Sequence, residues 1–575
     1  MAEYSNPQQE PGGEKRLLLI FLVTFIVMLA FQPLLKKYFP TPPAPQQTPS
    51  QSIPAKNANP NPSGAMTAPV SAGTAAKKAD KETDTVIEND LYKITFTNRG
   101  AQVRSWILKK YDNDAENGPL DLVNPVAAQQ YGYPLSLFTY DEDLGQKLQS
   151  DLYEVTRDGN SVTFEYADEE LQVRKKFTFD ESYVAKFETS VVYKGVQATA
   201  LPAWPAGFGD QTTPAFYAAG LIDYQYNKNI ERLAAKKISG GATLPGPFHW
   251  AGPTDQYFAA IFIPDDPAST SLVTLHNPLT LAKDPQKSDS KEVVKVDVLG
   301  AAVGNIHGPT TGRIFAGPKE LEILQKISVP GLTGADNDLN GLIDYGWWGI
   351  LAKPLFLWLK WTYKHVVANW GWAIILQTII ISLALLPLRV TQMKSMLKMQ
   401  RVAPQIKSIQ EKYKKYSLRD PRKAAMNEEI SALYKKEGVN PAGGCLPMVI
   451  QLPFIFAYYR MLGTALDLRH AHWLWIKDLS AADPIFVLPI LMVISSLVTS
   501  KMTPQAGMDP AQQRMMTVMM PLMMGFIFFR LAAGLNLYYA VVNIIGIAQQ
   551  SVMNRTHLGK EMREMMAKRA RKKEK

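Results

Sequence analysis

Polar side chains recur inside apolar segments that are long enough to cross a bilayer. In GWAIILQTIIISLALLPLRV, residues 371–390, Thr378 and Ser382 are four residues apart and share one helix face, and Arg389 lies near that face, seven residues beyond Ser382. Such groups are costly in lipid unless they face one another or water, and they usually mark a pathway. With the polar groups of two further segments they give the candidate contact residues Gln377, Thr378, Ser382, Arg389, Gln451, Tyr458, Tyr538, Tyr539 and Asn543.

Hydrogen bonding between packed helices would account for one or two of these residues. It accounts poorly for polar groups in three separate segments, with Arg460 and Arg530 near the ends of two of them. We therefore expect a hydrated pathway lined by side chains from several helices.

No residue pattern predicts catalysis, so we expect a protein that is not an enzyme. The chain has one cysteine, Cys445, no zinc-type Cys/His spacing and no GxxxxGK[ST] phosphate loop. Asp210, Asp223, His249 and Asp255 have the spacing of scattered surface residues. The sequence therefore predicts no catalytic residue, metal site or cofactor.

Apolar blocks predict a polytopic α-helical membrane protein with six transmembrane helices, because about 20 apolar helical residues cross a bilayer. The block at 17–31 follows Lys15 and Arg16 as in a signal peptide, but no small-x-small site ends it, so residues 1–34 are interpreted as an uncleaved anchor. The other blocks are 366–388, 445–462, 484–500 and two shorter spans within 515–550, separated by RLAAGLN at 530–536.

The location of the net charge of +10 predicts the topology. Residues 389–437 and the tail 553–575 are rich in Lys and Arg, so the positive-inside rule places both in the cytoplasm. Both termini should then be cytoplasmic, and the portion between the first two spans should be exported.

The exported portion has three parts. Residues 35–84 are rich in Pro, Ala and Ser and predict a disordered linker. Residues 85–335 alternate apolar and polar side chains, which predicts a large antiparallel β-sandwich. Residues 344–364 contain several Trp and Lys residues and predict an amphipathic helix on the outer membrane surface, with Pro354 in its first turn.

The loop 389–437 predicts a hairpin of two helices. In the first arm Pro404 interrupts an apolar face; the second arm begins at Asp420 and Pro421 and ends at Gly438. The hairpin would either only enforce the topology or contact incoming chains and the ribosome. The methionines between 515 and 524 indicate a pliable apolar surface rather than a metal site.

Several segments resemble one known family. VNPAGGCLPMVIQLPFIFAYY at 439–459 is similar to the signature segment of the YidC family of membrane protein insertases, in the Oxa/Alb superfamily. IKDLSAADPIFVLPILM at 476–492 and GLNLYYAVVNIIGIAQQ at 534–550 resemble later segments of that family, and residues 344–376 resemble its surface helix and second span. The exported β-domain is similar, more weakly, to that of Gram-negative members.

The resemblance implies a five-helix insertase core, residues 365–552, enclosing a hydrophilic groove that opens to the cytoplasm and laterally to lipid. It implies insertion and folding of newly made proteins of the bacterial inner membrane, alone or with the Sec translocon. The implied partners are nascent membrane-protein clients, the Sec translocon, membrane lipids and, through the hairpin and basic tail, the ribosome, with no DNA. The groove would be lined by Thr378, Ser382, Gln451, Tyr538 or Tyr539, and Asn543.

One position departs from the family pattern. Counting from NWG at 369–371, many members have an arginine where this chain has Ser382, and Arg389, Arg460 or Arg530 could replace it. Two other interpretations remain from the residues alone: a membrane transporter or channel, and an exported sugar-binding domain on an anchor.

Overall fold

The structure is a computed structural model that carries side chains. The predicted anchor at 1–34, nearly all of the predicted linker at 35–84 and the end of the basic tail lie outside the described residues. The structure describes residues 76–564 except 228, 239, 283–292, 335–336, 414–415, 417–419, 440–445, 503–514, 558–559 and 562–563.

Alternating side chains build the β-domain, as the sequence predicts. In strand β8, Leu171–Phe179, every second side chain from Leu171 onward is buried, while Arg174 is exposed. The strand pairs antiparallel with its neighbours β7, Ser161–Ala167, and β9, Val184–Tyr193. One face of this part of the sheet is therefore buried in the domain.

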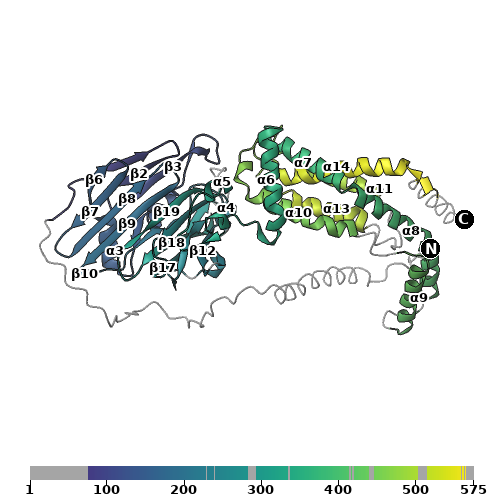
Figure 1. The fold of residues 1–575 in the computed structure, drawn as a ribbon, viewed down its shortest axis with the longest axis horizontal. Helices are drawn as coiled ribbons and strands as arrows, with labels where there is room; N and C mark the ends of the chain where they lie inside the picture. The colour runs from purple at the N-terminus through teal and green to yellow at the C-terminus, as the bar shows by residue number, and fades with distance from the viewer. Residues whose placement is uncertain are drawn as a thin grey trace, which may run out of the picture. The chain divides into compact units, whose positions relative to one another are not determined.

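In the described part of the domain the strands form three sheets (Figure 1). A four-stranded sheet has the order β1 (Asp84–Glu88), β2 (Tyr92–Thr97), β3 (Gln102–Asp112), β4 (Pro119–Asp121). A ten-stranded sheet has the order β13 (Asn229–Ala234), β12 (Leu221–Tyr226), β15 (Phe248–Thr254), β16 (Phe258–Pro264), β19 (Thr310–Pro318), β9, β8, β7, β6 (Glu154–Asp158), with β10 (Val196–Gln197) beside β9. A five-stranded sheet has the order β14 (Thr243–Pro245), β17 (Thr270–Ala282), β18 (Val293–Asn305), β11 (Leu201–Trp204), β5 (Ser136–Phe138).

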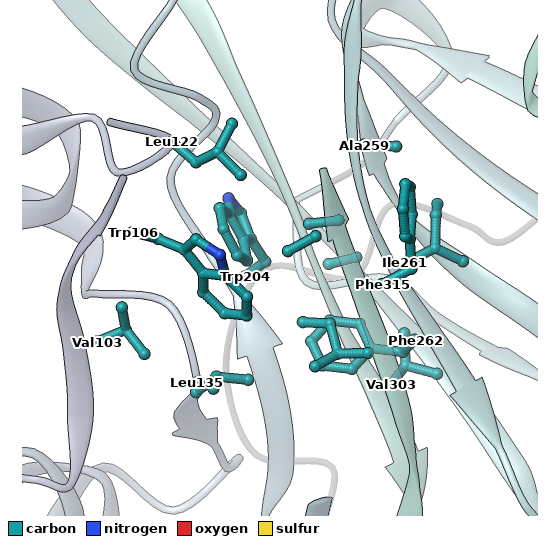
Figure 2. Packing of buried hydrophobic residues seen from close by; sticks show 14 of the residues in the cluster. Val103, Trp106, Leu122, Leu135, Trp204, Ala259, Ile261, Phe262, Val303 and Phe315 are labelled. Atoms are coloured by element: carbon teal, nitrogen blue, oxygen red, sulfur yellow. The ribbon is translucent and has the colours of Figure 1, made fainter. Parts of the chain in front are cut away.

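Large aromatic side chains fill the core between the sheets. Strand β18 packs across β12, β15 and β16, which makes the domain a sandwich. Figure 2 shows Trp106 of β3 beside Trp204 of β11, with ring centroids 5.9 Å apart, and Ile261 and Phe262 of β16 nearby. The β-sandwich predicted from the alternation is confirmed. The domain also contains four short helices among its described residues: α2 (Pro125–Tyr131), α3 (Glu142–Ser150), α4 (Pro214–Ala218) and α5 (Leu321–Leu324).

One lysine lies on the buried face of β8. Lys175 is fully buried, and its ammonium donates hydrogen bonds to the carbonyl oxygens of Gly100, Ala101 and Leu135 at 3.1, 2.6 and 2.7 Å. Burial lowers the pKa of Lys175 to about 7, although the three carbonyl dipoles favour the charged form. This side chain therefore ties β8 to the loops before β3 and β5.

Most of the described chain after the β-domain is helical. The helices are α6 (Gly349–His365), α7 (Trp370–Ala384), α8 (Leu386–Lys412), α9 (Arg422–Lys436), α10 (Leu446–Thr464), α11 (Val487–Met502), α13 (Met520–Phe528) and α14 (Ala533–Arg555). A π-helical turn, Met515–Met519, precedes α13, and the reversal predicted within 530–536 separates α13 from α14.

By length and composition, no single described helix qualifies as a membrane span. Helix α7 and the start of α8, Leu386–Gln392, qualify together across a bend of 49°. The shorter apolar helices are Val487–Met502 and Thr517–Phe528. The six predicted spans are therefore not confirmed by these criteria.

One expectation about proline is wrong. Helix α6 begins at Gly349, after the 3-10 turn Gly346–Trp348, so Pro354 lies inside the helix and not in its first turn. Helix α8 continues through Pro404 as one helix. The predicted pairing of α8 with α9 is confirmed, because Val402 and Ile406 pack against Ile430, Leu433 and Tyr434.

Charged side chains join the β-domain to the helices. Arg469, in the loop between α10 and α11, is buried; it pairs with Asp114 at 2.8 Å and donates to the carbonyl of Asp112 at 2.9 Å. On α6, Lys360 and Lys364 pair with Glu322 of α5 at 3.4 and 2.9 Å.

Candidate functional site

Helix α7 has its polar side chains on the buried side. Gln377 and Thr378 are 0% and 1% exposed and Ser382 is 9% exposed, whereas Ile380 and Leu383 are 44% and 56% exposed. This arrangement is the reverse of an amphipathic helix in water, and it is the one expected where the exposed side meets lipid and the inner side meets polar partners.

A hydrogen-bonded and stacked network joins four helices behind Thr378. Gln377 Nε2 donates to the carbonyl of Leu355 on α6 at 2.9 Å, and the Tyr458 hydroxyl of α10 donates to Gln377 Oε1 at 2.7 Å. The ring of Tyr458 stacks on Tyr538 of α14, with centroids 4.0 Å apart and an interplanar angle of 13°. Gln377 and Tyr458 are thus engaged within the packing of the bundle.

Thr378, Ser382, Arg389 and Tyr538 line one small cavity. Its volume is about 30 Å³, enough for one or two water molecules. Apolar side chains complete the wall: Ile381, Leu385, Leu388, Phe454 and Val542. The Thr378 hydroxyl also donates to the carbonyl of Ile374 at 2.6 Å, which leaves its oxygen free to accept a hydrogen bond.

The cation of this cavity is Arg389, at the start of α8. No described carboxylate forms an ion pair with it. Its guanidinium lies against α14 where the helix has no side chain: a Cβ added to Gly546 would be 3.0 Å from Nη1 of Arg389. The cavity therefore holds one positive charge that the described part of the chain leaves without a counter-ion.

Helix α14 supplies further polar contacts. Asn543 Nδ2 donates to Ser495 Oγ of α11 at 3.3 Å, and Gln549 Nε2 donates to the carbonyl of Ser382 at 3.1 Å. The Tyr539 ring meets Phe528 edge-on at 4.6 Å. Asn543 and Tyr539 therefore join α14 to α11 and α13, outside the cavity wall.

The structure brings together four of the nine predicted contact residues, Thr378, Ser382, Arg389 and Tyr538. The side chain of Gln451 lies outside the described residues. Arg460 does not line the cavity and faces Asp344 at 3.8 Å. Sequence reasoning missed Gln549 and Gly546; the spacing of 546 and 549 from Val542 on one helix was the only signal for them.

The acidic residues of the β-domain form no metal site among the described residues. Asp210 and Asp255 are both buried, and burial together with the negative charge of Asp255 raises the pKa of Asp210 well above its ordinary value. Asp255 Oδ1 accepts backbone hydrogen bonds from Tyr257 and Phe258, both at 2.7 Å. Burial in this pair therefore favours the protonated form of Asp210.

Two protein families match this chain in succession. Residues 84–358 match the family described as "YidC periplasmic domain", and residues 361–561 match the one described as "60Kd inner membrane protein". The boundary between the matches falls within α6. The class defined by these matches is an inner membrane protein with a periplasmic β-sandwich.

Relatives extend the match over nearly the whole chain. A protein of Syntrophus aciditrophicus named "Membrane protein insertase YidC" is 31% identical over 94% of this chain and 99% of its own length. A protein of Citrifermentans bemidjiense with the same name is 32% identical over 82% of this chain and 85% of its own. A crystal structure of an active YidC insertase aligns with 19% identity and a TM-score of 0.34, covering 84% of this chain and 96% of that one. The chain belongs to the YidC family of membrane protein insertases.

Proposed function

We propose that this protein inserts newly made inner-membrane proteins by admitting their polar segments to a hydrated groove, one wall of which is formed by Thr378, Ser382, Arg389 and Tyr538. The observation that carries the proposal is the shared cavity of these side chains among helices whose exposed side is apolar. A groove is the proposed working state, wider than the cavity of about 30 Å³.

The physical task is to lower the cost of moving charge through lipid. A charged residue at the bilayer centre costs about 2.5 to 3.5 kcal/mol on insertion scales, so a segment with two charges faces a barrier of several kcal/mol. Hydroxyls and water partway across the bilayer shorten the apolar path, and the cation of Arg389 attracts acidic segments. The apolar helix of the client then moves sideways into lipid, and no covalent step is required.

The finer arrangement belongs to the same proposal. We propose six spans with cytoplasmic termini: the anchor within 1–34, α7 with the start of α8, α10, α11, α13 and α14. Helix α6 would lie on the outer surface, and the β-domain would be periplasmic. The hairpin formed by α8 and α9, together with the basic tail, would meet the client and the ribosome, and the Sec translocon would act beside the bundle.

Crosslinking tests the groove. A photoreactive residue at position 382 should crosslink to the polar segment of a ribosome-stalled client, whereas one at Leu383, which is 56% exposed, should crosslink to lipid. Replacement of Thr378, Ser382 and Gln451 together by Leu should abolish insertion of a short-tailed client without unfolding the protein. Undiminished insertion would refute the groove.

A transporter or channel needs a continuous polar path instead. Liposomes containing the purified protein should remain tight to ions and small solutes during insertion. Steady solute flux in the absence of a client would favour the transporter.

A further inference from the structure

The β-domain contains a cleft unrelated to the polar cavity among the helices. Its volume is about 740 Å³, within the range of sites that bind ligands of several hundred daltons. The walls come from the end of β3, the turn between β8 and β9, the start of β19 and the segment that follows α5. All of these elements belong to the described residues.

Four cations surround this cleft: Lys110, Lys186, Arg313 and Lys326. The structure gives none of them an ion pair among the described residues; Arg313 donates only to the carbonyl of Ser328, at 2.7 Å. The cations come from four different segments, so their clustering is a product of the fold.

The carboxylates of the cleft offset this charge only in part. Glu320 Oε1 accepts a hydrogen bond from the Tyr111 hydroxyl at 2.8 Å, and burial raises the pKa of Glu320. Asp180 accepts hydrogen bonds from the backbone N–H and the hydroxyl of Ser182 at 2.8 and 2.6 Å. Glu181 is the third. Four cations against three carboxylates leave an excess of positive charge, which grows when Glu320 is protonated.

Two tyrosines line the same cleft. Tyr183 is 4% exposed, and its hydroxyl lies beside the hydroxyl of Tyr111, which donates to Glu320. Beside them, Phe179 and Ile323 supply apolar wall.

We infer that this cleft binds an acidic, partly apolar peptide segment, namely an exported loop of a membrane-protein client. The inference rests on the proposed function. Exported loops are depleted of Lys and Arg by the positive-inside rule, so a cleft with unpaired cations and apolar walls complements them. Ile323 of the cleft is next to Glu322, which pairs with Lys360 and Lys364 of α6, so the rim adjoins the helix that leads into the bundle.

Binding of a fluorescent peptide to the full chain in phosphatidylcholine nanodiscs tests the inference. A peptide alternating Glu with Leu and Phe should bind, and its Gln counterpart should bind about tenfold more weakly. The double variant Lys186→Gln, Arg313→Gln should bind the acidic peptide about tenfold more weakly than the wild type. The control double variant Lys93→Gln, Lys176→Gln removes equal charge outside the cleft and should bind the peptide as the wild type does.

The inference would be overturned if both double variants bound the acidic peptide equally weakly, or if neither bound it more weakly than the wild type. Nanodiscs containing phosphatidylglycerol provide the second arm. If that lipid displaces the peptide from the wild type but not from Lys186→Gln with Arg313→Gln, the cleft is a lipid site and the inference is wrong. Insertion of a client without an exported loop is measured in parallel and reports on the groove alone. If this insertion is normal while the peptide does not bind, the inference about the cleft is wrong and the proposed function still stands.

Discussion

Nη1 of Arg389 lies 3.0 Å from the position that a Cβ atom of residue 546 would occupy. Helix α14 accommodates the guanidinium at this point because residue 546 is glycine. The position of the Arg389 guanidinium, near the start of α8, therefore depends on Gly546 of α14, which has no side chain to displace it. Ser382, at the position where the family resemblance leads us to expect an arginine, shares the same cavity.

Gly546→Leu should displace the Arg389 guanidinium from the cavity. Insertion of a client with an acidic tail should then fall by about tenfold, the value of one charge-assisted contact of about 1.5 kcal/mol, while a neutral client is much less affected. The assay is protease protection of the two clients in proteoliposomes. Gly463→Leu is the matched control, because a Cβ at that helical position would meet nothing within 4 Å. Equal losses for Gly546→Leu and Gly463→Leu would contradict the role of the close approach.

Moving the charge provides a second test. Arg389→Ala should impair acidic clients more than neutral ones, and Ser382→Arg should be tolerated, because both side chains line one cavity. Arg389→Ala combined with Ser382→Arg should restore most of the lost insertion, since the cavity again holds one cation. If the double variant is no better than Arg389→Ala with either client, the position of the charge and not its presence determines function.

Asp210→Asn should stabilise the β-domain at neutral pH. Burial raises the pKa of Asp210, so the folded state holds its proton more tightly than the unfolded state, and stability falls as pH rises above about 4. Each unit of such a shift costs about 1.4 kcal/mol, and an amide, which does not ionise, avoids this cost. Urea unfolding should show the gain at pH 7 and a smaller one near pH 4. The control Asp90→Asn, at an exposed position, should leave the free energy of unfolding unchanged at both pH values. A stability gain of Asp210→Asn that is larger at pH 4 than at pH 7 would refute this account.

Lys175→Met should destabilise the β-domain strongly. The substitution leaves three buried carbonyls without their donor, at roughly 1 kcal/mol or more each, so we expect a loss of about 3 kcal/mol. Tryptophan fluorescence during urea unfolding reports it, because Trp106 and Trp204 lie in the same core. Lys176→Met, on the other face of β8, should cost well under 1 kcal/mol, as is usual for surface substitutions. Similar losses for both variants would mean that the three hydrogen bonds contribute little.

The sequence predicts elements with strong periodicity and misses contacts that depend on distant packing. The strands around 161–193 and the pairing of α8 with α9 follow from local apolar patterns. Thr378 and Ser382 were found because their spacing alone places them on one face. By contrast, the bond from Gln549 to Ser382 joins residues 167 positions apart, so nothing local predicts it. The apolar side chains of the cavity, such as Phe454 and Val542, resemble any lipid-facing residue until the helices are packed.

Pro354 gave the clearest error. A proline is compatible with the first turn of a helix, and only the observed start of α6 at Gly349 shows that Pro354 lies inside the helix. The buried environment of Lys175 shows the same limit, because its acceptors lie 75, 74 and 40 residues away in the chain.

The reversed polarity of α7 also constrains how this protein is itself made. The buried polar side of the helix is covered by α6 through Leu355, by α10 through Tyr458 and by α14 through Gln549. When α7 leaves the ribosome, α10 and α14 have not yet been synthesised, and α14 is the last of the described helices. During its own biogenesis the half-built bundle therefore leaves Gln377 Oε1 without Tyr458 and the carbonyl of Ser382 without Gln549. Unmet hydrogen bonds of this kind in a nascent helix are the condition that an insertase relieves in its clients.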